Sequence, residues 1–469
     1  MTTVAIVCSP NMGIVDSWLP VLTAARERHP DWTLVALVPR AWAIGIRPEA
    51  AAIRAADRVL DRVAVEVVPG EYRAAHGFAD AERVRGRLSS VAEPLHRWRV
   101  SHRFRGPLAA RAIRGAGRAV ALASPAGRRL RLRGLRVSVL LIDPSIEDRT
   151  ETVALVRALG DPPALALSHG LGYLAPTGAP RPPGHSRLVG VYAYSEAHAD
   201  QFAGELGLAR AQVRVTGVPR HDPHVRLGYG DGDAIGVNDA DADAAGTAGG
   251  TVLVISRPAT SPGERPGGSS VDWLPAGRKR AQLRAIHRVV CEERGLRLVV
   301  TLHPKEVDDR EVREALPAEG EGRTWWLSEQ HPLELAAGLR FAVSFSSGVA
   351  VDLLSADVPT IELQDVTGAS AYDGPDALRD ARGRVLRTSE RRHGLVLPAD
   401  DEDDLRAQVA RILDAPEATL AELRAAYRAR YADPTGAVAT ILADVESLVA
   451  GRPSTAGRPS TEGPAGTDH

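Results

Sequence analysis

Short apolar runs alternate with longer segments of helical spacing along most of this 469-residue chain. Continuous apolar runs of this kind are typical of strands buried on both faces of a parallel sheet. In the first half the predicted strands are Val4–Cys8, Leu34–Val38, Val63–Val68, Val137–Ile142, Leu165–Leu167, Val189–Tyr194 and Val213–Val215. Helical patterns at Ser17–Arg28 and Glu196–Leu206 lie between them. Strands that alternate with helices predict an α/β architecture.

The pattern restarts after residues 228–250, a stretch rich in Gly, Asp and Ala that we interpret as a flexible linker. Predicted strands of the second half are Thr251–Ile255, Leu296–Leu302, Phe341–Val343 and Pro359–Leu363. Its predicted helices are Arg278–Arg294, Val349–Leu354, Glu402–Leu413, Leu420–Arg430 and Ala437–Val449. A chain of this length is too long to fold around a single hydrophobic core.

We therefore predict two Rossmann-like parallel-sheet domains, 1–227 and 251–398, that face each other across a cleft. Helices in 399–450 would cross back over the junction, and the Gly-Arg-Pro-Ser-Thr repeats in 451–469 indicate a disordered tail.

Composition narrows the class of protein. A formal net charge of −1 argues against a nucleic-acid binder, and no apolar stretch reaches the roughly 18 residues of a membrane helix. Two distant cysteines, Cys8 and Cys291, indicate neither a disulfide framework nor a metal site. We expect a cytoplasmic protein without a cofactor.

Residues 83–136 differ from the chain as a whole, whose charges nearly balance: they contain fifteen Arg and a single acidic residue, Glu93. Their apolar positions are compatible with amphipathic helices. Three interpretations stay open: a solvated helical face, a patch for an anionic membrane surface, or a site for a polyanionic acceptor. The second would place the protein peripherally at the inner face of the plasma membrane.

In the second half, the candidate functional residues come directly after predicted strands. Ser346, Ser347 and Gly348 lie between a strand and a helix, where backbone amides and hydroxyls attract phosphate, although Ser is also a common helix cap. His303 ends another strand, with Lys305 two residues later, and could donate to a phosphate oxygen of a leaving group. Arg257 follows the first strand of this half and is a further candidate for the donor.

Candidates in the first half also follow strands. His169 and Gly170 form a turn after one strand, where a neutral histidine could accept the proton of an acceptor hydroxyl, and Asp143 follows another and is the fallback for that role. Arg220 follows Gly217 and Pro219, and either binds phosphate or pairs with Asp222. Metal binding by His221, Asp222 and His224 is the weaker alternative because no complementary ligand cluster is visible.

Four motifs in order resemble the GT-B transferases that build bacterial envelope polymers. They are His169-Gly170, Gly217 to Asp222, His303-Pro304 and Ser346-Ser347, and they are similar to the CDP-glycerol glycerophosphotransferase and capsule polysaccharide transferase group. That group usually has an acidic residue, and often Tyr, before the serine pair, where this chain has Ser344 and Phe345. The resemblance implies that His169 is the base and that His303, Ser346 and Ser347 bind donor phosphates.

The predicted function is a metal-independent transferase. It would move a glycosyl or polyol-phosphate group from a CDP-, CMP- or UDP-linked donor to a cell-surface polysaccharide or lipid-linked acceptor. The alternatives are a UDP-N-acetylglucosamine 2-epimerase-like enzyme, for which Glu362 and Asp365 are the main late acidic candidates, and a non-catalytic partner in glycan assembly or export.

Overall fold

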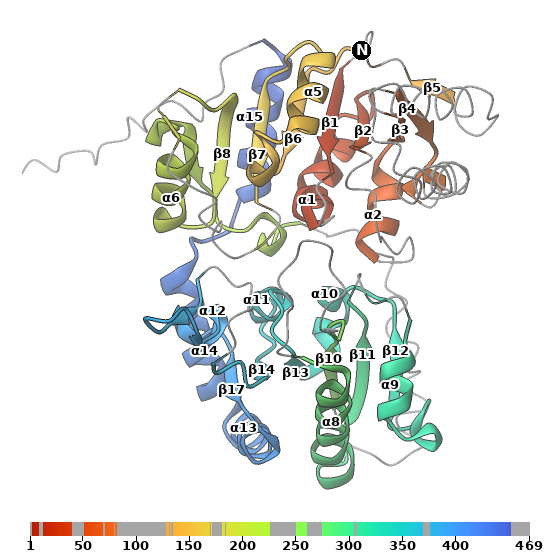
Figure 1. Cartoon of the computed structure of the whole chain (residues 1–469), viewed down its shortest axis with the longest axis vertical. Coiled ribbons are helices and arrows are strands. Elements are labelled where there is room, and N and C mark those ends of the chain that lie inside the picture. Colours follow the sequence, from red (N-terminus) through yellow and green to blue (C-terminus); the bar gives the residue numbers. More distant parts are fainter. Residues whose placement is uncertain are drawn as a thin grey trace, which may run out of the picture.

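Two large sheets, each covered by helices, dominate the part of the chain that the computed structural model describes (Figure 1). The described residues are 2–8, 13–39, 51–68, 71–78, 80–81, 128–130, 132, 135–168, 170, 181–182, 184–225, 250–259, 274–303, 306, 308–368 and 376–451. The predicted α/β class with two Rossmann-like sheets is confirmed. The boundaries at 227 and 251 stay predictions.

The N-terminal sheet has the strand order β5-β4-β3-β2-β1-β6-β7-β8-β9. Pairing is parallel from β3 to β9, and the edge pairs β3–β4 and β4–β5 are antiparallel. The strands are β1 Thr3–Val7, β2 Thr33–Val38, β3 Arg62–Val68, β4 Glu71–Ala75, β5 Arg128–Leu130, β6 Val139–Ile142, β7 Ala164–Leu167, β8 Leu188–Ala193 and β9 Val213–Val215.

Helices cover both faces of this sheet because successive side chains of a strand point to opposite sides. In β1, Val4 and Ile6 pack in the cluster that contains Trp18 of α1, whereas Ala5 and Val7 join Phe202 of α6. The helices of this half are α1 Gly13–Arg28, α2 Ala51–Val59, α5 Thr150–Ala158 and α6 Glu196–Leu206. Such two-sided burial explains the uninterrupted apolar runs.

The C-terminal sheet is parallel throughout, in the order β12-β11-β10-β13-β14-β17. Its strands are β10 Thr251–Ile255, β11 Arg297–Thr301, β12 Trp325–Ser328, β13 Leu339–Ser344, β14 Thr360–Leu363 and β17 Leu397–Ala399, and a separate antiparallel hairpin joins β15 Leu378–Arg379 to β16 Val385–Arg387. The helices are α8 Ala276–His287, α9 Arg310–Ala315, α10 Pro332–Leu335, α11 Val349–Ser355, α12 Ser389–Arg392, α13 Glu402–Asp414 and α14 Pro416–Arg430. A π-helical turn, Arg288–Glu293, extends α8.

The last helix, α15 Ala437–Val449, returns to the N-terminal half and packs on α1, as predicted (Figure 1). Its Asp444 is fully buried and accepts hydrogen bonds from Tyr192 of β8 at 3.1 Å and Arg214 of β9 at 3.2 Å. Close packing fixes the crossing itself. A Cβ at Gly217, whose φ is 72°, would lie 2.7 Å from the carbonyl oxygen of Ala432.

One expectation needs correction. The Arg-rich segment was expected to be helical, but its residues 128–130 form β5, which pairs with β4, because this edge of the sheet offers free backbone hydrogen-bonding groups. Most of the remaining Arg-rich segment, nearly all of the linker and residues 452–469 lie outside the described residues. Strands β4, β12, β15, β16 and β17 were not predicted.

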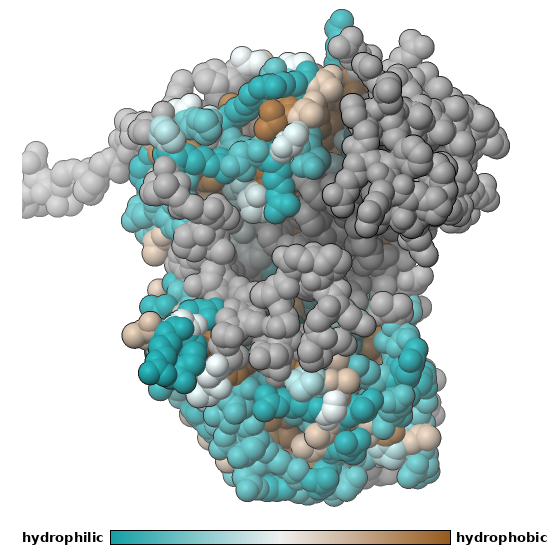
Figure 2. Space-filling view, in the orientation of Figure 1, coloured by the Kyte–Doolittle hydropathy of each residue, from teal (hydrophilic) through white to brown (hydrophobic). Residues whose placement is uncertain are grey.

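The visible described surface of the C-terminal half is predominantly hydrophilic (Figure 2). In the described part of the chain, no helix combines the length and apolarity needed to cross a bilayer. Cys8 and Cys291 are both buried as free thiols.

Candidate functional site

Three neighbouring strands of the C-terminal sheet end in the predicted donor-binding residues. In the order β11-β10-β13, they lead into His303, Arg257 and the serine loop, which we define as Ser346 to Gly348. Carboxyl ends of adjacent parallel strands share one edge of a sheet, which is where open α/β sheets bind ligands. This edge faces the N-terminal half (Figure 1).

The serine loop is tightly shaped. Ser346 has a φ of 64°, an uncommon left-handed conformation for a residue other than glycine, and Arg257 Nη1 donates to its carbonyl oxygen at 2.6 Å. Val349 N–H donates to Ser347 Oγ at 3.3 Å, so the capping role considered for this serine is present. Ser347 is half-buried and Gly348 is exposed. The loop therefore combines an anchored guanidinium with accessible polar groups.

His303 begins a turn directly after β11. It is half-buried, and its backbone N–H donates to Glu306 Oε2 at 2.6 Å. Lys305, predicted to bind phosphate, lies outside the described residues. The position of the His303 turn is thus set by Glu306, a residue that the sequence pattern did not single out.

The predicted acceptor-side residues follow strands β6 and β7 of the N-terminal sheet. Asp143 is buried and accepts from Ser145 N at 2.8 Å as the cap of a short 3-10 turn. His169 lies outside the described residues, but both of its neighbours are described. The Tyr194 hydroxyl donates to the carbonyl oxygen of Ser168 at 2.7 Å, which fixes the strand end just before His169, and Gly170 is half-buried.

Arg220 lies at the junction between the halves and has a partner other than the one expected. Its Nε donates to Asp352 Oδ1 of α11 at 2.6 Å and its Nη1 to Ser17 of α1 at 3.3 Å. Asp222, the partner considered from the sequence, instead accepts from backbone N–H groups of His224 and Val438. The guanidinium therefore links the two halves of the molecule.

His221 completes this buried link. Its Nε2 lies 2.7 Å from Asp352 Oδ1 and its Nδ1 lies 2.7 Å from the Tyr427 hydroxyl of α14. Burial lowers the pKa of His221 below its usual value, although Asp352 partly opposes this. A neutral ring satisfies both contacts, with Nε2–H donating to the carboxylate and Nδ1 accepting from the hydroxyl. We call Arg220, His221 and Asp352 the junction triad.

A second contact spans the junction beside the triad. His331 caps α10, and its Nε2 lies 3.8 Å from Asp16 Oδ1 of α1. Burial lowers the pKa of His331, while the nearby Asp16 carboxylate opposes the shift. Helices and turns that follow the strands of the two sheets are therefore in direct contact through polar side chains.

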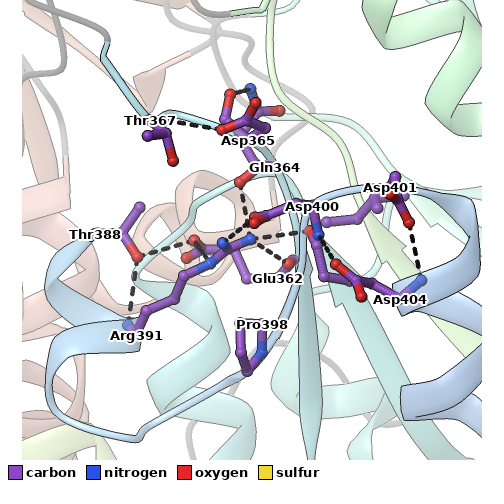
Figure 3. A network of polar contacts seen from close by, with 12 residues as sticks. Glu362, Gln364, Asp365, Thr367, Thr388, Arg391, Pro398, Asp400, Asp401 and Asp404 are labelled. Carbon is purple, nitrogen blue, oxygen red and sulfur yellow. Dashed lines mark hydrogen bonds and ion pairs between the residues drawn. The ribbon is translucent and has the colours of Figure 1, made fainter. Parts of the chain in front are cut away.

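Glu362, an acidic candidate, belongs to a structural network at the end of β14 (Figure 3). It is buried, accepts from Thr388 Oγ1 at 2.9 Å, and lies 2.9 Å from Arg391 Nε. Arg391 Nη2 also donates to three backbone carbonyls, of Glu362, Gln364 and Ala399. Burial raises the pKa of Glu362 to about 7. The Glu362 side chain therefore holds Thr388 and Arg391, and Arg391 in turn joins β14 to β17.

The structure adds residues that sequence reasoning missed: Ser17, Tyr194, Lys279, Glu306 and Asp352. Asp352 alone carried a signal, because a carboxylate inside the apolar run Val349 to Leu354 is a candidate for a buried contact. The described residues contain no group of three or more His, Cys, Asp or Glu side chains placed to hold a metal ion.

Comparison with known proteins extends the description of the fold. No family model and no curated protein matches the sequence. A candidate UDP-N-acetylglucosamine 2-epimerase from Listeria monocytogenes aligns with a TM-score of 0.51 at 13% identity, over 95% of this chain and 96% of that one. The S. aureus MnaA–UDP co-structure gives 0.51 at 14%, over 97% and 99%.

A variant of the wall teichoic acid polymerase TagF gives a TM-score of 0.49 at 11% identity, over 96% of this chain and 89% of that chain. At these identities the likeness is one of fold. The two parallel sheets, the facing strand ends and the returning C-terminal helix define a GT-B architecture.

Proposed function

We propose that this protein is a transferase that moves a glycosyl or polyol-phosphate group from a nucleotide-activated donor to a cell-surface glycan or lipid-linked acceptor. The observation that carries the proposal is the convergence of His303, Arg257 and the serine loop on three adjacent strand ends that face the other half. Cationic and hydroxyl-bearing side chains on one such edge suit a diphosphate.

In the proposed reaction the donor phosphates lie against the serine loop and Arg257. The acceptor hydroxyl oxygen forms a bond to the donor's activated carbon or phosphorus, and its proton passes to His169. The bond from that atom to the nucleotide breaks, with the electron pair leaving on the nucleotide's phosphate oxygen. A hydrogen bond from His303 would stabilise this oxygen as charge develops.

Thermal-shift measurements with CDP-, CMP-, UDP- and GDP-linked donors test donor binding first. Acceptor-dependent release of free nucleotide then tests transfer. Ser347→Ala should weaken binding severalfold, because it removes a hydroxyl from the serine loop. Ser355→Ala is the matched control, since Ser355 lies at the far end of α11, where its hydroxyl donates to the Asp352 carbonyl oxygen at 2.6 Å. If no donor shifts the melting temperature, the proposal is wrong.

An epimerase-like activity is the second candidate, supported by the fold of the two proteins that align at a TM-score of 0.51. The network around Glu362 argues against it, because that carboxylate is buried among Thr388 and Arg391. Asp365 likewise accepts from Thr367 N at 2.9 Å. Conversion of a UDP-sugar to its C2 epimer in the absence of an acceptor would favour the epimerase.

A further inference from the structure

Glu306 closes the turn that carries His303. The His303 N–H donates to Glu306 Oε2 at 2.6 Å, and the Glu306 N–H donates to the His303 carbonyl oxygen at 2.8 Å. Two reciprocal hydrogen bonds across four residues fix the direction in which the chain leaves β11. The direction of the His303 side chain depends on that backbone.

The other oxygen of the same carboxylate reaches the neighbouring strand. Ser256, fully buried at the end of β10, donates from Oγ to Glu306 Oε1 at 2.9 Å. Because Arg257 follows Ser256 directly, one carboxylate holds the two adjacent strand ends that carry His303 and Arg257. Glu306 therefore links two strand ends that the sheet already pairs through the hydrogen bond from Ser256 N–H to the Thr301 carbonyl oxygen at 2.9 Å.

Lys279 of α8 forms an ion pair with this carboxylate. Its ammonium group bonds Glu306 Oε1 and lies 2.8 Å from Glu311 Oε2 of α9. The Lys279 and Glu306 side chains are only 1% and 5% exposed, whereas Glu311 is 29% exposed. Lys279 is thus a buried cation between one buried and one partly exposed carboxylate.

Burying such a pair is costly. The desolvation of two charges offsets much of their attraction, so apolar side chains of similar volume often serve stability as well or better. What apolar side chains would not supply is a directional acceptor for the His303 N–H and the Ser256 hydroxyl. The arrangement is better explained by geometry at the strand ends than by stability alone.

We propose that Lys279 and Glu306 are positioning residues that set His303 and Arg257 for a donor diphosphate. The inference rests on the proposed function and deepens it. Glu306 acts through the two strand ends, and Lys279 acts by holding the Glu306 carboxylate in place. Neither residue needs to touch the donor.

The test compares Glu306→Gln with Glu311→Gln in the full-length protein. Both variants remove one carboxylate from Lys279, but only the first disturbs the His303 turn. Each is measured for melting temperature without ligand and for affinity, by calorimetry, toward the nucleotide donor that most stabilises the wild type. We expect a 10- to 100-fold loss of affinity for Glu306→Gln and a change within twofold for Glu311→Gln, while both melting temperatures fall.

Two further variants keep the test decisive if Glu306→Gln folds poorly. Lys279→Met combined with Glu306→Gln removes both buried charges, and should recover melting temperature without recovering donor affinity. Ser256→Ala changes no charge. It should lower donor affinity severalfold while the melting temperature stays nearly unchanged. In a turnover assay the loss should appear in KM for the donor more than in kcat.

Donor affinity within threefold of wild type in both the double variant and Ser256→Ala would overturn the positioning roles, and the proposed function would stand. A wild-type protein that binds no nucleotide in the panel would overturn both. The two failures are therefore distinguishable in one set of titrations.

Discussion

Replacing Asp352 with Asn should destabilise the protein by removing the charge that joins its halves. Arg220 Nε and His221 Nε2 both meet Asp352 Oδ1, at 2.6 and 2.7 Å, and the three side chains are at most 6% exposed. Asparagine keeps nearly the same shape but carries no charge. The buried guanidinium of Arg220 would then lose its closest carboxylate.

The expected loss of stability follows from the pKa shift of Asp352 and from the usual cost of breaking a buried ion pair. Burial by itself raises the pKa of Asp352, but Arg220 and His221 outweigh it and lower the pKa from 3.8 to about 2. At about 1.4 kcal/mol per pH unit, this shift corresponds to about 2 kcal/mol of stabilisation at neutral pH. Removing one partner of a buried pair typically costs about 3–5 kcal/mol. We therefore expect the free energy of unfolding to fall by about 3 kcal/mol at pH 7.

The sign of the pH dependence is also fixed. Because the folded pKa lies below the unfolded one, the stabilisation is present above pH 3.8 and is lost as the pH falls toward 2. Urea denaturation followed by circular dichroism at several pH values measures it. The difference between wild type and Asp352→Asn should shrink across that acid range.

Glu329→Gln is the control, because Arg54 and Glu329 form an exposed ion pair between the same two halves at 3.4 Å. A pair of that kind contributes about 0–1 kcal/mol. If Asp352→Asn costs no more than Glu329→Gln at pH 7, the reasoning about the junction triad is refuted.

Three other outcomes are expected. The wild type should lose stability relative to Glu362→Gln as the pH rises from 4.5 to about 7, because burial raises the pKa of Glu362 from 4.5 to about 7 in the folded state and the unfolded state releases its proton first. Melting temperatures that diverge in the other direction would contradict this. His169→Asn should keep donor affinity but lower turnover by about 10²–10⁴, and near-normal turnover would remove it from the mechanism. Gly217→Ala should lower the melting temperature, because a Cβ there would lie 2.7 Å from Ala432 O at a φ of 72°; an unchanged melting curve would show that the crossing tolerates it.

Much of the fold could be predicted because strands buried on both faces appear in the sequence as uninterrupted apolar runs. Runs such as Val4 to Cys8 and Thr251 to Ile255 have no polar interruption, and they became central strands. Edge strands show no such run. Glu71–Ala75 contains Glu and Arg, and Arg128–Leu130 is short and basic, so only pairing with neighbours makes them strands.

The candidate site likewise contains positions that the sequence predicted and contacts that it did not. The positions of His303 and Ser347 followed from where strands end, which local pattern reveals. The contacts of Arg220 did not follow, because its partner Asp352 lies 132 positions away in the sequence. Lys279 stands in a segment with several arginines, and nothing local distinguishes the one cation that becomes buried. Pairings of this kind arise only when separate elements pack.

The crossing at Gly217 has a consequence for motion between the halves. The chain passes from α14 to α15 there, on one side of the molecule, while the Arg54–Glu329 pair joins α2 to the end of β12 on the opposite side (Figure 1). Rotation about the crossing would displace the α2 side most and the junction triad much less. The exposed Arg54–Glu329 pair would therefore separate first, while the crossing acts as the pivot and the buried triad keeps its contacts.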